Sequence, residues 1–105
     1  MNLTKAWWFL RTQLTRYKYI RVGKHSYVGK PLYIQRRGIV IGDNVRIYPG
    51  MRAELTCKDA KITIDDNVSV GQNFHIVCYR DNLVIGRDTT ISGNVFISNV
   101  DHSYL

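Results

Sequence analysis

Cysteine, proline and long apolar runs are all scarce in this sequence. Its 105 residues include two prolines and two cysteines, Cys57 and Cys78. Two cysteines make no disulfide framework and these two lack the spacing of a zinc-binding pair, so we expect buried free thiols in a reducing cytosol. The longest uncharged apolar run near the start, residues 6–10, is shorter than a membrane span of about 20 residues or a signal-peptide core of about 7–15. We therefore expect a cytoplasmic protein.

Acidic residues are missing from the first third of the chain. Residues 1–37 contain nine Lys or Arg and no Asp or Glu, whereas residues 38–105 contain six basic and eight acidic residues, which gives the net charge of +7. A basic end can meet phosphate, a membrane surface or an acidic partner, but a solvated face is the interpretation that we favour. Basic and aromatic residues do not alternate as in an RNA-binding sheet, so we expect no nucleic-acid partner. The composition, 45% hydrophobic and 22% charged, indicates one small globular unit.

The first segment, residues 1–18, is predicted to be an amphipathic helix. Apolar residues recur at steps of four and three, which makes one stripe of a helix; they are Leu3, Trp7, Leu10, Leu14 and Tyr17. We expect this helix to pack on the end of the element that follows. Peripheral contact with the inner face of a membrane is the alternative, because Trp7 and Trp8 have basic neighbours.

The second segment, residues 19–105, is a repeat with a period of six. Three sets begin "IGDN", "IDDN" and "IGRD" at Ile41, Ile64 and Ile85. Each of these isoleucines is the first anchor of its set, an aliphatic or small residue, and further anchors follow it at intervals of six residues. We expect the anchors to point inward, and also the residues four positions after an anchor; these are Val45, Met51, Cys57, Val68, Phe74, Thr89 and Val95. The residue after an anchor is often Gly, and we expect it to adopt the corner dihedrals.

Three extended sides of six residues close one coil, and the coils stack as parallel strands about 4.8 Å apart. The sequence therefore predicts an all-β fold, a parallel β-helix of about four coils, behind a short N-terminal helix.

The pattern resembles the hexapeptide-repeat acyltransferases, over roughly residues 22–105. It is most similar to the sugar O-acetyltransferases, which include the galactoside and maltose enzymes and those that decorate lipopolysaccharide, capsule and exopolysaccharide. The resemblance implies a left-handed β-helix, a homotrimer with sites between subunits, acetyl-CoA as co-substrate and a sugar or glycan as acceptor. It implies an enzyme that transfers an acetyl group to a sugar hydroxyl.

The resemblance also implies site residues. In the family, a coil of the form I/V-G-x-N/D is followed, two sides later, by a corner histidine that acts as the catalytic base. "LVIGRDTTISGNVFISNVDHSYL" carries His102 at that place. The family's acceptor-binding asparagine matches Asn73 of the Asn73-Phe74 pair, and an acidic acceptor residue matches Asp81. Asp101 could orient the histidine. Asn73 could instead be a corner asparagine with left-handed dihedrals.

Two alternatives accompany this interpretation. Coils of the family continue past the histidine and form most of the coenzyme A groove, so we expect a truncated member; an inactive solenoid that binds an acceptor or serves as a scaffold is then the other possible function. The same solenoid also hosts a zinc carbonic anhydrase, which needs three histidines that meet. His25, His75 and His102 are too widely spaced in the sequence for it, so we expect no metal.

Overall fold

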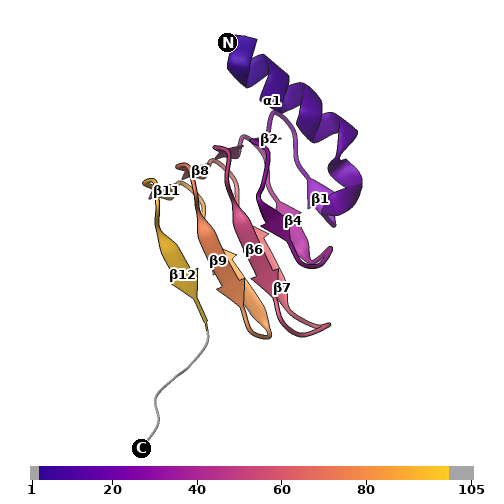
Figure 1. Cartoon of the computed structure of the whole chain (residues 1–105), viewed down its shortest axis with the longest axis vertical. Coiled ribbons are helices and arrows are strands. Elements are labelled where there is room, and N and C mark those ends of the chain that lie inside the picture. The colour runs from indigo at the N-terminus through magenta and orange to yellow at the C-terminus, as the bar shows by residue number, and fades with distance from the viewer. Residues whose placement is uncertain (1–2, 100–105) are drawn as a thin grey trace, which may run out of the picture.

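The computed structural model describes residues 3–99 and shows a parallel β-solenoid of about four turns behind one helix (Figure 1). Each turn contributes one strand to each of three four-stranded sheets. Sheet A consists of β1 (Arg21–Val22), β4 (Ile39–Ile41), β7 (Lys61–Ile64) and β10 (Asn82–Ile85). Sheet B consists of β2 (Tyr27–Val28), β5 (Arg46–Ile47), β8 (Ser69–Val70) and β11 (Thr90–Ile91). Sheet C consists of β3 (Tyr33–Ile34), β6 (Arg52–Leu55), β9 (His75–Cys78) and β12 (Phe96–Ser98). The predicted all-β parallel architecture is confirmed.

The register of the strands reproduces the spacing of the sequence sets. Ile41 of β4 pairs with Ile64 of β7, and Ile64 pairs with Ile85 of β10, so each set begins one turn of the solenoid. The first turn is shorter than these two, because Val22 of β1 pairs with Ile41. Every strand pair in the three sheets is parallel. Identical positions of the repeat therefore lie above one another along the solenoid.

The core is a single column of side chains inside the three sheets. The anchors of the three sets are buried from Ile41 to Ile91, as predicted, whereas the last anchor, Ile97, is only partly buried. Among the residues four positions after an anchor, Val45, Met51, Val68 and Phe74 are fully buried, whereas Cys57, Thr89 and Val95 are only partly buried. β-branched and aliphatic residues suit this interior because each turn covers the apolar face of the next.

The corners correct one interpretation of the sequence. The left-handed dihedral belongs to the third residue after the anchor, not to the glycine directly after it. At this position six non-glycine residues have φ between 55° and 64°, namely His25, Asn44, Asn67, Asn73, Asp88 and Asn94, and Asp81 has a φ of 65° at a different place in its turn. Four of the glycines that follow an anchor, namely Gly23, Gly29, Gly42 and Gly71, are needed for a different reason. A Cβ on Gly42 would overlap the side chain and backbone of Asp66 in the next turn. These glycines permit the close approach of stacked corners, while Asn and Asp tolerate the left-handed conformation.

The helix α1 (Leu3–Leu14) lies across the first turn and is followed by a short 3-10 helix, η1 (Arg16–Lys18) (Figure 1). It contacts β2 through Trp8, whose ring lies 5.7 Å from Tyr27 and 5.1 Å from Tyr48, and through buried Thr12. The helix thus packs on the end of the solenoid. The stripe that identified it in the sequence faces the opposite way, because Leu3, Trp7, Leu10 and Leu14 are exposed.

Candidate functional site

The four residues that the resemblance selects fall into two groups. Asp101 and His102 lie outside the described residues, so their predicted roles stay predictions. Asn73 and Asp81 are described, and the strand β9 separates them: Asn73 lies in the corner that precedes this strand and Asp81 in the corner that follows it. One side of the solenoid spans about 20 Å. Within one chain, Asn73 and Asp81 are therefore not brought together.

Asn73 is an exposed corner residue with a φ of 58°, so the corner interpretation is confirmed. Its backbone N–H donates to the carbonyl oxygen of Pro49 in the turn before, and its Nδ2 donates to Oδ1 of Asn94 in the turn after, at 3.2 Å. It also lines a surface cavity of about 480 Å³, together with Leu32, Pro49 and other residues of three successive turns. A corner role does not occupy the whole amide, so Asn73 could still contact a ligand in this cavity.

Asp81 is exposed and has a φ of 65°. Its backbone carbonyl accepts a hydrogen bond from the N–H of Lys61 at 2.8 Å. Its carboxylate has no hydrogen-bond or ion-pair partner among residues 3–99. The carboxylate is thus available to accept hydrogen bonds from hydroxyl groups, which is the chemistry that a sugar acceptor requires.

A cluster that the sequence interpretation did not select lies on the outer face of sheet C. The carboxylate of Glu54 on β6 bonds Nε2 of His75 on β9, and the ring of His75 lies 4.8 Å from the ring of Phe96 on β12. Nε of Arg52 is 3.9 Å from the same carboxylate. The imidazole is therefore held between a carboxylate and an aromatic ring, which fixes its orientation.

The sequence does contain a signal for this cluster. Glu54, His75 and Phe96 recur at one constant interval, and they occupy outward positions that alternate with the buried Ala53, Leu55 and Ile76. His75 is half-exposed and paired with Glu54. The pairing could not be deduced from spacing alone, because the backbone partner of His75 in β6 is Arg52 and Glu54 is a diagonal neighbour.

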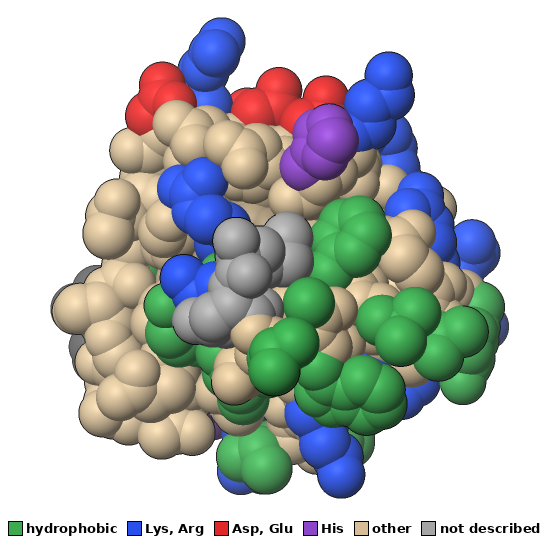
Figure 2. Space-filling model, turned by 90° about the horizontal axis from the view of Figure 1, so that it is seen from above, with side chains coloured by type: hydrophobic (Ala, Val, Ile, Leu, Met, Phe, Trp, Pro, Cys, Tyr) green, Lys and Arg blue, Asp and Glu red, His purple; other side chains and the backbone are tan. Residues whose placement is uncertain are grey.

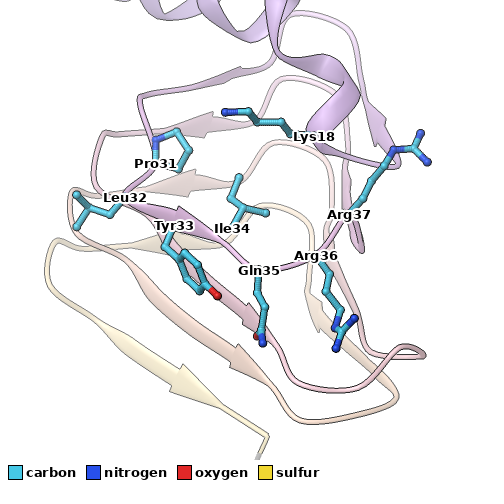
Figure 3. Close-up of a pocket in the computed structure, with 8 residues that line it drawn as sticks. All are labelled: Lys18, Pro31, Leu32, Tyr33, Ile34, Gln35, Arg36 and Arg37. Atoms are coloured by element: carbon cyan, nitrogen blue, oxygen red, sulfur yellow. The ribbon is translucent and has the colours of Figure 1, made fainter.

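A basic cavity of about 310 Å³ lies beside β3, at the same end of the solenoid as α1 (Figure 3). Lys18 extends over it toward Pro31, while the guanidinium groups of Arg36 and Arg37 point away from Ile34. Nε of Arg37 donates to the carbonyl oxygens of Tyr17 and Tyr19, and Nε of Arg36 donates to that of Leu55. These arginines therefore tie the chain entering the solenoid to the first and second turns, and the cavity is a shallow basic depression.

Metal-ligand residues do not gather in the described part of the chain: residues 3–99 contain no group of three or more His, Cys, Asp or Glu able to hold an ion. Cys57 and Cys78 are free thiols, and Cys78 is buried, with its sulfur 3.4 Å from the carbonyl oxygen of Lys61.

Comparison with known proteins gives no assignment. No protein-family model matches the chain, and neither a curated protein nor a solved structure matches it significantly.

Proposed function

We propose that this chain acts in acetyl-CoA-dependent O-acetylation of a sugar hydroxyl, in cytoplasmic synthesis of a cell-surface polysaccharide. The proposal rests on the resemblance of the repeat to hexapeptide-repeat sugar acetyltransferases. It is supported by the parallel solenoid, which is the architecture that the resemblance implies, and left-handed coiling is part of the same proposal.

The observation that carries the proposal is the constant register of the last turns. The strand β12 pairs with β9, and β10 with β7, at the same shift along the sequence; Phe96 pairs with His75 and Asn82 with Lys61. His102 follows Asp81 by this same interval in the sequence. Residues one turn apart occupy equivalent positions in a solenoid. In the proposal, Asp81 as the acidic acceptor residue and His102 as the base therefore belong to one column of corners.

In the proposed reaction, the imidazole of His102 removes the proton of the sugar hydroxyl while the hydroxyl oxygen attacks the thioester carbonyl carbon. The carbon–sulfur bond then breaks, and the imidazolium returns the proton to the coenzyme A thiolate. Asn73 and Asp81 hold the acceptor through its other hydroxyls, and Asp101 orients the base. A cysteine nucleophile is not needed, since acyl transfer is direct.

A homotrimer belongs to the proposal for a geometric reason. Asn73 and Asp81 lie at opposite ends of β9 and cannot contact one hydroxyl in a single chain. Acceptor sites between subunits, which the resemblance implies, could bring the Asn73 corner of one subunit to the Asp81 corner of its neighbour.

The test is acetyl transfer by the purified chain to a panel of sugars and glycosides, followed through release of the coenzyme A thiol. Loss of a general base lowers the rate about 10²–10⁴-fold, so His102→Ala should show that loss. His75→Ala is the matched control, because His75 has no role in the proposed reaction and should leave the rate within about twofold.

Binding of acetyl-CoA is measured separately by thermal unfolding. A ligand at about 100 times its dissociation constant stabilises the folded state by about 2.7 kcal/mol. Equal rates for His102→Ala and the unmodified chain would contradict the assignment of the base. Absence of both transfer and stabilisation would contradict the proposed function.

A further inference from the structure

The exposed apolar stripe of α1 has no partner in the described part of the chain. Its four members are exposed by 90% (Leu3), 56% (Trp7), 49% (Leu10) and 67% (Leu14). With about 100° between successive helical residues, they fall within an arc of about 60°, and the centre of this arc is about 150° from that of Trp8 and Thr12. The helix is thus apolar on its outer side as well as docked on its inner side.

The docked side fixes the orientation of the outer side. The hydroxyl of Thr12 accepts the N–H of Val28 at 2.7 Å and is buried, and Trp8 packs on Tyr27 and Tyr48. Rotation of α1 to bury its stripe would break these contacts. The stripe therefore stays at the surface of the folded chain.

The charge of this end of the molecule complements an anionic surface. The helix and the whole first turn contain nine Lys or Arg, and the first acidic residue of the sequence is Asp43. This aspartate lies 3.6 Å from the guanidinium of Arg21 and can neutralise only part of so large a positive charge. Figure 2 looks onto this end and shows hydrophobic side chains gathered over one half of it, with Lys and Arg around them.

We propose that this end of the solenoid docks on an anionic phospholipid membrane, with the stripe of α1 inserted among the headgroups and acyl chains. An exposed apolar stripe with an indole, flanked by cations, is the pattern of helices that lie in a membrane interface. Lys and Arg near the surface add attraction to anionic lipid. A second copy of the chain fits less well, because two stripes facing one another would bring two basic ends together. This proposal does not depend on the proposed acetyl transfer.

Two adjacent tryptophans, the only ones in the chain, provide the test. In Trp8→Phe the emission reports on exposed Trp7, and in Trp7→Phe it reports on packed Trp8. Vesicles of phosphatidylcholine with phosphatidylglycerol are added to each variant at low salt. The emission of Trp7 should shift to the blue by about 10 nm or more if the indole leaves water for the interface, while that of Trp8 should stay nearly constant.

The stripe is tested by cosedimentation with the same vesicles. Leu10→Gln combined with Leu14→Gln keeps residues that favour a helix and should weaken binding about tenfold or more. Val84→Gln is the matched control, because Val84 on β10 is 51% exposed, close to the 49% of Leu10. Vesicles of phosphatidylcholine alone, or about 1 M salt, should also weaken binding by at least tenfold, because salt screens exposed charges.

Each contrary outcome overturns the proposal. Absence of binding by the unmodified chain excludes the membrane as occupant. Binding by the double variant that equals binding by the unmodified chain excludes the stripe as the surface that contacts the membrane. Self-association in sedimentation equilibrium that is abolished by the double variant, without any vesicle binding, would identify the stripe as an interface between copies.

Discussion

Replacement of Thr12 by valine should lower the stability of the folded chain, because it removes the acceptor of a buried N–H between the helix and the solenoid. In sheet B, the N–H groups of Tyr27 and Gly29 donate to the second turn, so the N–H of Val28 points toward α1. The hydroxyl of Thr12 accepts this N–H at 2.7 Å and donates to the carbonyl oxygen of Trp8, also at 2.7 Å. Valine has nearly the same shape as threonine but no hydroxyl, so it leaves a buried N–H without an acceptor.

The expected loss follows from the burial of this group. An unsatisfied buried donor costs about 1–3 kcal/mol, so we expect about 2 kcal/mol less free energy of unfolding. For a domain of this size, that corresponds to a decrease in Tm of about 8–16 °C. Urea unfolding followed by circular dichroism measures the free energy, with the m-value checked for constancy.

Thr15→Val is the matched control. The hydroxyl of Thr15 also donates to a carbonyl oxygen four residues back, that of Arg11. This carbonyl accepts the N–H of Thr15 as well, and the hydroxyl of Thr15 makes no hydrogen bond to the described strands of the solenoid. We expect a change of less than about 0.5 kcal/mol. Equal destabilisation by the two variants would refute the view that the Thr12 hydroxyl is needed as the acceptor for the N–H of Val28 at the edge of β2.

Two further predictions concern the interior. Burial raises the pKa of Tyr19 to about 12, above its value of about 10 in the unfolded chain. The folded state therefore loses roughly 2–3 kcal/mol of stability as pH rises through 10 toward 12. Urea unfolding at pH 9 and pH 11.5 should show this loss, and Tyr19→Phe should remove most of it, whereas Tyr17→Phe should not. Phe74 is fully buried, whereas Phe96 is exposed. Phe74→Ala should therefore lower the free energy of unfolding by about 3–5 kcal/mol, and Phe96→Ala by about 1 kcal/mol or less. A similar decrease in both variants would contradict the inward orientation of Phe74.

The sequence was sufficient to predict the solenoid because its pattern repeats. Each set places an apolar residue at the same phase, and a period of six is typical of a parallel β-helix, in which three sides close around one interior. The lengths of two turns could be predicted from the positions of Ile41, Ile64 and Ile85, which pair with one another in sheet A. The first turn has the anchors Val22 and Val28 at the same spacing of six, and the strand register shows that it is shorter, because Val22 pairs with Ile41.

Other features could not be predicted, because the same type of residue can be required at a position for more than one structural reason. A glycine permits both unusual dihedrals and close approach, and Gly42 is required for the second reason. Likewise, a helical stripe indicates amphipathicity but not which side docks. Trp8 packs on the rings of Tyr27 in β2 and of Tyr48 directly after β5, and Thr12 bonds the edge of β2, so the helix packs through a face that contains a hydroxyl.

The candidate site was predictable only in part. The corner conformation of Asn73 follows from the tolerance of asparagine for positive φ. The pairing of Glu54 with His75 depends on a diagonal contact across two strands, which the spacing of residues does not determine.

The near-constant length of the turns has a consequence for how the chain folds. Strand partners in all three sheets are separated by a single turn of the chain, so no pairing requires the closure of a long loop. Loop-closure entropy changes only slowly with length, which makes the entropic cost of adding each turn nearly equal. Once two turns have paired, each new turn meets a finished edge and a finished apolar face. Folding should then advance from turn to turn, and the order of folding should be set by the local stability of each turn and not by its place in the sequence.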